Sequence, residues 1–378
     1  MIKILNVLTD SNIGGAGRLL VNYLHNFDRT RFDSAVVLPK DSRLIPAVRA
    51  EGYDVIETEY GRDESWDRRA VGELRRIIRE YKPDIVHTHS SLSARVAAWQ
   101  CGVPARFYTR HCAFEPSRRL TSFPGKQLNG LMNRVLSTDI VAVADAAKQN
   151  LTDTGVPAGM ITVIINGVEP LRETSPEEND ALRDRLGIGR EDFVCGIVAR
   201  LEDYKGHSFL LESAKAVIAA APGTVFLIVG EGTERERLEK QAADLGIAGQ
   251  VIFTGFCDDV APYYGIMDLN LNCSWGTETS SLALSEGMSA GVPAVATTYG
   301  GNPYMITEGV NGLLVPEKDA DAMADAILKI RNDPALLKRL SDGARRLYRE
   351  KFTARAMTEQ LERMYEAAYA RSGGRGKE

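Results

Sequence analysis

The sequence predicts an α/β protein built from two doubly wound parallel sheets, one in each half of the chain. Three observations lead to this prediction. The chain has 378 residues, and a single hydrophobic core stops growing at roughly 250–300 residues, so two domains are expected. Short apolar runs alternate with longer stretches of helical character, as in βαβ units. This alternation pauses once, in a polar stretch at residues 169–192.

The apolar runs have the length and composition of strands that are buried on both faces of a parallel sheet. In the first half, strands are expected at residues 2–8, 35–38, 84–87, 106–109, 140–143 and 161–164. In the second half, they are expected at residues 193–199, 224–229, 251–254, 269–272, 294–297 and 313–315. The helical stretches between them include residues 68–81 and 209–220.

The polar stretch at 169–192 is predicted to be the linker between two Rossmann-like domains, residues 1–168 and 193–351. Open parallel sheets bind ligands at the carboxyl ends of their strands. We therefore expect the two domains to face one another across a central cleft that holds the ligands.

Composition indicates a soluble globular protein, with 44% hydrophobic and 26% charged residues. No run approaches the ~18 apolar residues of a membrane span, and the opening residues lack the features of a signal peptide. We expect a cytoplasmic protein. The five cysteines are scattered, which favours free thiols. The net charge of −5 argues against nucleic acid as a partner.

Two glutamates, Glu278 and Glu286, form the strongest candidate site. A strand at 269–272 and a helix at 280–290 would place Glu278 at the amino end of that helix, which is a ready site for phosphate. The Glu286 carboxylate, further along, could accept two hydrogen bonds from a vicinal diol such as a ribose. Surface glutamates at this spacing are also common, but the apolar residues between these two favour a site.

Two cations, Arg200 and Lys205, flank the turn between the strand at 193–199 and a helix that begins near Ser208. Fixed cations at the carboxyl end of a strand suit a diphosphate. Exposed Arg and Lys usually bind nothing, so this pair alone is weak evidence for a binding site. Its place in the same domain as the two glutamates strengthens that evidence.

Two glycine-rich turns follow expected strands, at residues 14–17 and 230–232. Each begins like a GxGxxG dinucleotide fingerprint, but Leu20 and Arg235 stand in place of the third glycine, which argues against NAD(P). Such turns let the backbone approach a phosphate or a sugar closely, so Gly15 and Gly230 are candidate binding residues.

Three histidines lie at or just after strand ends: His87, His89 and His111. Two histidines two residues apart could suggest a metal, but no third ligand is evident. Structural hydrogen bonding is expected for His87 and His89. His111 is expected to face the cleft.

Taken in order, these motifs resemble the retaining glycosyltransferases of family 4, which have the GT-B fold, over nearly the whole chain. The matching segments are Gly-Gly at 14–15, Pro-Asp-Ile-Val-His-Thr-His at 83–89, Asn-Gly-Val at 166–168, Ala-Arg-Leu at 199–201, Lys-Gly at 205–206, Gly-Glu-Gly at 230–232, Phe-Thr-Gly-Phe at 253–256 and Glu-x7-Glu at 278–286, with Gly-Val-Pro-Ala-Val at 291–295.

The resemblance implies roles in the second domain, which would bind the donor. Arg200 and Lys205 would bind the donor diphosphate and stabilise the leaving nucleotide. Glu286 would bind the ribose, and Glu278 would contact the transferred sugar. The backbone at Ser281 and Leu282 would cap the distal phosphate.

Further roles follow from the same resemblance. Phe256 would border the base, and Gly230 would belong to the donor site. Gly15 would approach the phosphate from the first domain, and His111 would contact the sugar near its reacting carbon. The final helix, at 352–370, would cross back onto the first domain. Family members often have glycine and glutamate where this chain has Thr279 and Tyr304, two positions that bear on the choice of donor sugar.

The expected activity is that of a retaining hexosyltransferase. It would move a sugar from a nucleotide-diphosphate sugar, with a UDP-sugar favoured, to an acceptor hydroxyl in cell-surface polysaccharide or glycolipid synthesis. Another GT-B enzyme, such as a nucleotide-sugar 2-epimerase or a phosphorylase, and a non-catalytic binding protein are the alternatives. No cofactor or metal is expected, because Asp258-Asp259 lacks the context of a metal-binding pair and protein cations can meet the charge.

The segment at residues 102–135 is the one notable basic cluster, with six basic residues against Glu115 alone. It also carries Phe107, Phe114, Phe123, Leu128, Leu131 and Met132. Many family members use such a surface to approach anionic lipid and lipid-linked acceptors, which would place the protein peripherally at the inner face of the membrane. The alternative is a solvated acceptor loop.

Overall fold

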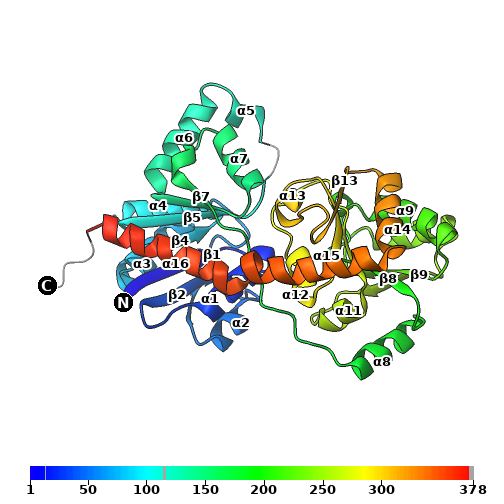
Figure 1. Cartoon of the computed structure of the whole chain (residues 1–378). Helices are drawn as coiled ribbons and strands as arrows, with labels where there is room; N and C mark the ends of the chain where they lie inside the picture. The colour runs from blue at the N-terminus through cyan, green and yellow to red at the C-terminus, as the bar shows by residue number, and fades with distance from the viewer. Residues whose placement is uncertain (13, 114–115, 374–378) are drawn as a thin grey trace. The chain divides into compact units, whose positions relative to one another are not determined.

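The computed structural model describes residues 1–12, 14–113 and 116–373. The chain divides into two compact units (Figure 1). Unit 1 comprises Met1–Gly167 and Ala354–Glu378, and unit 2 comprises Val168–Thr353. Each unit contains one sheet of parallel strands with helices on its faces, so the predicted α/β class is confirmed. Among the described residues, no helix is both long and apolar enough to cross a membrane.

The sheet of unit 1 has seven strands in the order β3-β2-β1-β4-β5-β6-β7. They are β1 (Ile2–Leu8), β2 (Phe32–Pro39), β3 (Asp54–Thr58), β4 (Ile85–His89), β5 (Ala105–Arg110), β6 (Asp139–Ala142) and β7 (Ile161–Val163). The order reverses between β1 and β4, so loops diverge there and leave room for a ligand at the carboxyl edge.

Helices cover both faces of this sheet. They are α1 (Gly15–Asn26), α2 (Ile45–Ala50), α3 (Arg68–Tyr81), α4 (Leu92–Gln100), α5 (Arg118–Thr121), α6 (Gly125–Leu136), α7 (Asp145–Asp153) and α16 (Ala354–Arg371). One face buries α3 and α4 against Leu5 and Val7. The opposite face buries α1 and α16 against Ile4 and Leu8. Figure 1 shows α16 lying along this sheet beside α1.

The final helix joins unit 1 because of the spacing of its apolar residues. Met357, Leu361, Tyr365 and Ala368 recur every three or four positions, lie on one side of α16 and are buried in the same core as α1. The Tyr365 hydroxyl lies 2.5 Å from Nδ1 of His87 on β4, which ties the helix to the centre of the sheet.

The sheet of unit 2 has six strands in the order β10-β9-β8-β11-β12-β13. They are β8 (Phe193–Val198), β9 (Thr224–Val229), β10 (Val251–Gly255), β11 (Leu269–Asn272), β12 (Ala294–Thr297) and β13 (Gly312–Val315). The order reverses between β8 and β11, which are neighbours in the sheet.

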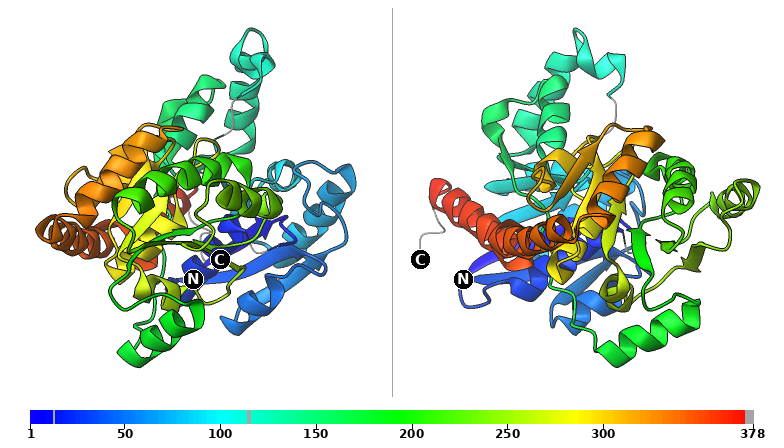
Figure 2. Two further views of the ribbon diagram at one scale, coloured as in Figure 1. Left: turned by 90° about the vertical axis from the view of Figure 1, so that its right-hand side faces the viewer. Right: turned by 45° about the vertical axis from the view of Figure 1, so that its right-hand side comes forward.

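The helices of unit 2 also occupy two layers. They are α8 (Pro176–Leu186), α9 (His207–Ala220), α10 (Arg235–Asp244), α11 (Ala261–Ile266), α12 (Leu282–Ala290), α13 (Asn302–Met305), α14 (Ala320–Arg331) and α15 (Pro334–Leu347). Helices α9, α10 and α14 pack on one face, and Figure 2 shows α9 and α14 side by side. Helices α8 and α11 pack on the other face.

The segment at 169–192 differs from the linker that the sequence suggested, because it contributes α8 to unit 2. Ser175 caps this helix by accepting a hydrogen bond from the backbone N–H of Glu178, Pro176 fills the first turn, and Gly187 ends the helix with a left-handed conformation. Leu182 is buried beside Tyr264. Most residues of α8 are polar, so the sequence pattern did not reveal that Leu182 is buried.

All twelve predicted strands are present, with ends that differ by three residues or fewer. The strand that the sequence prediction missed is β3, with the sequence Asp-Val-Ile-Glu-Thr. It forms the edge of its sheet, so it is only half-buried and its composition is too polar for the buried pattern that identified the others.

Candidate active site

The carboxyl edge of the sheet in unit 2 brings the main predicted residues together at the point where the strand order reverses. The loop after β8 carries Arg200 and Lys205, and the loop after the neighbouring β11 carries Glu278 and Ser281. Segments that are about 70 residues apart in the sequence therefore meet at the place where doubly wound sheets bind ligands.

Lys205 and Glu278 form the centre of this site. The Lys205 ammonium lies 2.7 Å from Oε2 of Glu278, and the two side chains are only 17% and 8% exposed. The same carboxylate oxygen accepts hydrogen bonds from the Ser274 hydroxyl at 3.0 Å and the Asn272 amide at 3.5 Å. Three donors thus fix one carboxylate, and a cation held in this way can meet an incoming anion without reorganising.

Helix α12 begins directly beside this ion pair. Ser281 is its N-cap, and the Ser281 hydroxyl accepts hydrogen bonds from the backbone N–H of Leu284 at 3.3 Å and from the Asn272 amide at 3.2 Å. The predicted helix started at 280, and the observed one starts at Leu282. The first N–H groups of α12, including that of Leu282, therefore project from its amino end, where the helix dipole favours a phosphate.

The loop that carries Glu278 is held in a strained and crowded conformation. Thr277 has a φ of 45°, which is rare for a β-branched residue. A Cβ at Gly301 would lie 1.5 Å from the carbonyl oxygen of Thr279, and one at Gly300 would lie 1.9 Å from that of Glu278. Strain of this kind is kept where the position of a loop matters for function.

Arg200 and Glu286 occupy different surroundings. Arg200 is exposed, and its Nη2 donates a hydrogen bond to the Tyr204 hydroxyl at 2.8 Å. Within the described parts of the chain, no carboxylate forms an ion pair with Arg200, so its charge is available to a ligand. Glu286 is buried in α12, on the helix that starts at Ser281.

The two remaining predicted residues of unit 2 follow β9 and β10. A Cβ at Gly230 would lie 2.0 Å from the carbonyl oxygen of Ala199, so packing already requires a glycine there. The Gly230 N–H also donates to the Gly255 carbonyl at 2.9 Å. Phe256, the next residue, is 65% exposed, which suits a residue that stacks on a ligand rather than one that fills a core.

In unit 1, the three histidines form one connected chain. Nε2 of His87 lies 2.6 Å from the Thr109 hydroxyl, the His87 and His89 rings stack, and Nδ1 of His89 lies 2.9 Å from Nε2 of His111. The expected structural role of His87 and His89 in hydrogen bonding is therefore observed. His89 also supports His111, a link that the sequence alone did not indicate.

Burial keeps these histidines neutral. It lowers the pKa of His87 to about 3 and that of His111 to about 4, and it lowers the pKa of His89 well below its usual value, with neighbouring charges adding to each effect. Among the described residues, no group of three or more His, Cys, Asp or Glu side chains is arranged to hold a metal ion.

Gly14 and Gly15 stand at the amino end of α1, directly after β1. A Cβ at either position would meet no atom of the described chain within 4 Å, whereas one at Gly17 would meet Leu44 at 2.7 Å. Packing thus explains Gly17 but not Gly15. A ligand that approaches the backbone would explain it.

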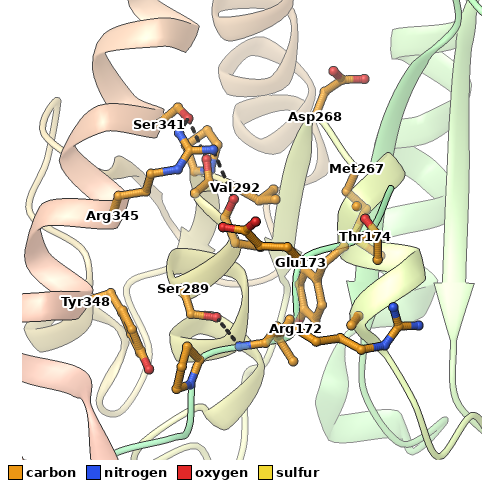
Figure 3. Close-up of a pocket in the computed structure, with 18 of the residues that line it drawn as sticks. Arg172, Glu173, Thr174, Met267, Asp268, Ser289, Val292, Ser341, Arg345 and Tyr348 are labelled. Atoms are coloured by element: carbon orange, nitrogen blue, oxygen red, sulfur yellow. Dashed lines mark hydrogen bonds between the residues drawn. The ribbon is translucent and has the colours of Figure 1, made fainter. Parts of the chain in front are cut away.

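Another cavity lies elsewhere in unit 2. A pocket of about 760 Å³ is formed by residues 170–174, which precede α8, together with parts of α11, α12 and α15. Figure 3 shows Arg172, Ser289 and Arg345 around it. Asp268 and Pro293 in its lining precede strands β11 and β12. This pocket is therefore at the amino edge of the sheet, opposite the predicted site.

Three residues that the sequence prediction passed over contribute to the site: Asn272, Ser274 and Tyr204. Asn272 is the last residue of β11, a strand that was predicted correctly. Its polar side chain in a buried strand could have marked it as a site residue. Ser274 and Tyr204 had no signal of their own, because each matters only through a contact across the two loops.

Comparison with known proteins places the chain in a family. A model described as Glycosyltransferase Family 4 matches residues 13–172, and one described as Glycosyl transferases group 1 matches residues 178–347. The UDP-Gal:alpha-D-GlcNAc-diphosphoundecaprenol alpha-1,3-galactosyltransferase of Escherichia coli is 28% identical over 281 residues, which cover 71% of this chain and 72% of that protein. The alpha-monoglucosyldiacylglycerol synthase of Acholeplasma laidlawii is 27% identical over 71% of this chain and 72% of its own.

Solved structures share the fold. HepE of Anabaena in complex with UDP superposes with a TM-score of 0.84 at 20% identity, covering 97% of this chain and 100% of that one. A glycosyltransferase from Rickettsia africae gives a TM-score of 0.84 at 21% identity, covering 97% and 98%. The fold is therefore GT-B. With two family models spanning nearly its whole length, this chain belongs to the family 4 glycosyltransferases.

Proposed function

We propose that this glycosyltransferase is a retaining enzyme that moves a sugar from a UDP-sugar to an acceptor hydroxyl in cell-surface polysaccharide or glycolipid synthesis. The observation that carries the proposal is the buried contact between Lys205 and Glu278 at the amino end of α12. It combines a fixed cation, a fixed carboxylate and a helix dipole at the carboxyl edge of a doubly wound sheet.

The chemistry follows from how charge moves during transfer. The bond between the sugar carbon and the diphosphate breaks, a bond from that carbon to the acceptor oxygen forms, and the hydroxyl proton leaves with the diphosphate. Negative charge grows on the diphosphate, where Lys205, Arg200 and the N–H groups near Ser281 would bind it. Preorganised donors of this kind are worth roughly 3–4 kcal/mol each in the transition state.

Other residues would position the donor. Glu286 would bind the ribose, Phe256 would border the base, and Glu278 would contact the transferred sugar. From unit 1, the backbone at Gly15 would approach the phosphate, and His111 would contact the sugar near its reacting carbon. The neutral state of His111 supports this role, because an imidazolium would repel a sugar that becomes cationic.

A UDP-sugar is supported by several structural neighbours. HepE was solved with UDP and with UDP-glucose, and the pneumococcal O-GlcNAc transferase GtfA with UDP and GlcNAc at a TM-score of 0.74. Thermal shift with UDP-, GDP- and ADP-sugars should give the largest rise in melting temperature for a UDP-sugar. A larger rise with a GDP- or ADP-sugar would overturn this choice of base.

We also propose that the reaction needs no metal, because Arg200 and Lys205 would neutralise the diphosphate in its place. Turnover should therefore be unchanged after treatment with EDTA. Activity that is lost with EDTA and regained with Mg²⁺ or Mn²⁺ would contradict this part of the proposal.

The decisive test is Lys205→Ala, with Lys338→Ala as the matched control, since Lys338 is an exposed lysine on α15 in the same unit. Loss of Lys205 should lower nucleotide release by two orders of magnitude or more, while the control should keep wild-type turnover. Wild-type turnover in Lys205→Ala would contradict the proposed function.

Donor conversion without any acceptor would favour the alternative activity, that of a nucleotide-sugar 2-epimerase. NMR of the product's anomeric proton would test whether the anomeric configuration is retained.

Peripheral contact with anionic membrane through residues 102–135 is part of the proposal. The segment between α5 and α6 exposes Phe123 at 81%, and α6 exposes Leu128 and Leu131 at 62% and 59%. Arg118 and Arg119 on α5 are also exposed. Phe114 and Glu115 lie outside the described residues. Co-sedimentation should increase with the anionic lipid content of vesicles and decrease in the Phe123→Ser variant; binding that ignores lipid charge would contradict it.

A further inference from the structure

A second pocket, of about 430 Å³, lies entirely within unit 1 and contains none of the residues predicted for the donor. Side chains from α4, α6 and α7 and from strand β5 line it. Its volume is within the usual range for small-molecule sites. Figure 1 shows α5, α6 and α7 grouped on one side of this unit's sheet.

Two arginines line this pocket. Arg95 on α4 is only 6% exposed, and its guanidinium lies over the Tyr108 ring at 4.4 Å. Its Nη2 donates to Oδ1 of Asn133 at 2.7 Å and its Nε donates to the Ser137 hydroxyl at 3.2 Å. Arg110, the last residue of β5, donates from Nη2 to Oδ1 of Asn150 at 3.1 Å.

Neither arginine has a carboxylate partner among the residues that the structure describes. Every hydrogen-bond acceptor that they reach there is a neutral amide or hydroxyl oxygen. The Nε of Arg110 is buried and has no hydrogen-bond partner in the described chain. Two largely buried cations with only neutral partners are costly, because buried charges are normally paired. An anion in the pocket would remove this cost.

The amino end of α4 adds to the positive potential. Ser90 and Leu92 line the pocket, and Ser91 between them is the N-cap of this nine-residue helix. The helix dipole therefore favours negative charge on the same side as the two guanidinium groups. Arginine forks match phosphate oxygens better than any other protein cation.

From this geometry we infer that the pocket binds a phosphate group of the acceptor, so that Arg95 and Arg110 select an acceptor carried on a lipid phosphate or diphosphate. The inference rests on the proposed transferase function and adds the acceptor's chemical class to it.

The lipid source is favoured by what surrounds the pocket. Leu120 of α5 and Met132 of α6 line it, while Leu128 and Leu131 on α6 and Phe123 between the two helices are exposed. A phosphate bound between the arginines would thus lie next to an apolar surface that can contact a lipid chain. A water-soluble sugar phosphate would use the arginines but not this surface.

The first experiment measures anion binding without turnover. Full-length protein is saturated with UDP to fill the donor site, and inorganic pyrophosphate is titrated by calorimetry. Arg95→Gln and Arg110→Gln should each weaken pyrophosphate binding about 10- to 100-fold. The control Arg76→Gln, which removes an exposed arginine on α3 that does not line the pocket, should bind as wild type does.

Arg95 also joins α4 to α6, so its loss could disturb folding. Arg95→Lys keeps the charge and should retain most of the binding, and thermal melting of each variant reports on folding. If Arg110→Gln binds pyrophosphate weakly but melts at the wild-type temperature, the result supports the site independently of Arg95. Unchanged pyrophosphate binding in both Gln variants would overturn the inference.

The second experiment compares three acceptors that carry one sugar: the methyl glycoside, the 1-phosphate and a short-chain prenyl diphosphate. Arg110→Gln should raise KM for the prenyl diphosphate at least tenfold. An equal KM for the 1-phosphate and the prenyl diphosphate would exclude the lipid source. An equally low KM for the methyl glycoside and the prenyl diphosphate would overturn the phosphate site. Wild-type protein that neither transfers the sugar nor hydrolyses the donor would instead overturn the proposed function.

Discussion

Lys205 and Glu278 form a buried ion pair. This contact sets the charge that each side chain presents to a ligand. The carboxylate is fixed by Lys205, Ser274 and Asn272. In the proposed function, the donor diphosphate would share the Lys205 ammonium with a carboxylate that also repels it. Such an arrangement would lower ground-state affinity and leave the positive charge in position for the transition state.

Replacement Glu278→Gln should separate these effects. Binding of UDP should tighten severalfold, because the repelling charge is gone. Turnover should fall at least tenfold, because the sugar loses its fixed carboxylate. The free energy of unfolding should drop by about 1–3 kcal/mol, because Lys205 loses its buried partner. Calorimetry, initial rates and urea unfolding measure the three quantities.

Glu239→Gln is the control for this experiment, since Glu239 is a half-exposed partner of Arg235 on α10. It should change none of the three quantities noticeably, because surface ion pairs contribute little. If Glu278→Gln weakened UDP binding instead of tightening it, the repulsion argument would be wrong.

His89 is expected to act on catalysis through His111. Nδ1 of His89 lies 2.9 Å from Nε2 of His111, so it fixes the tautomer and orientation of that ring. His89→Phe should lower kcat at least tenfold with little change in the donor KM, and His89→Gln, which can keep a hydrogen bond, should recover part of the rate. Equal rates in both variants would show that the hydrogen bond does not matter.

Among the secondary-structure elements, the amino end of α1 gives a clear test, because two nearby glycines have different reasons to be there. Gly15→Ala meets no steric obstacle within the described chain, and alanine favours a helix over glycine by up to about 1 kcal/mol. The variant should be as stable as the wild type or more so, yet its turnover should fall at least tenfold if a ligand approaches this backbone.

Gly17→Ala is the matched comparison on the same helix. Its Cβ would lie 2.7 Å from Leu44, so it should lower the melting temperature through packing. Urea unfolding and initial rates for both variants measure the difference. Full activity in Gly15→Ala would show that no ligand approaches the backbone at Gly15.

Across the whole molecule, four histidines with lowered pKa values make stability depend on pH. Burial lowers the pKa of His87 to about 3 and that of His111 and of His207 to about 4, with His89 also well below its usual value. The unfolded chain titrates near 6.5. Between pH 6.5 and 4 the unfolded state therefore binds more protons, and stability falls as the pH falls through this window.

Each such histidine contributes up to about 1.4 kcal/mol per pH unit in that window. Unit 1 holds His87, His89 and His111, and unit 2 holds His207, so unit 1 should lose stability faster. Trp275 reports on unit 2 once Trp66 and Trp99 are replaced by Phe. Urea unfolding at pH 7, 6 and 5 should show this order, and stability that is independent of pH across that range would refute it.

Much of this architecture could be predicted from the sequence because its signals are local. Buried parallel strands are continuous apolar runs, and twelve of them were identified. Edge strand β3 and helix α8 escaped, because each buries little apolar surface and its pattern is mostly polar. The helix that carries Glu286 was predicted to start at residue 280, two residues before the observed start of α12 at Leu282.

The sequence by itself determined the α/β class and the family, and it named the candidate donor-site residues, because strand periodicity and motif spacing are local features of the chain. Only the tertiary structure decided which of these residues touch. The contact of Lys205 with Glu278 joins residues 73 positions apart, and that of His89 with His111 joins residues 22 positions apart. Arg95 and Arg110, 15 positions apart, line one pocket. Such contacts depend on how strands are ordered in a sheet, and the order of strands leaves no local mark in the sequence.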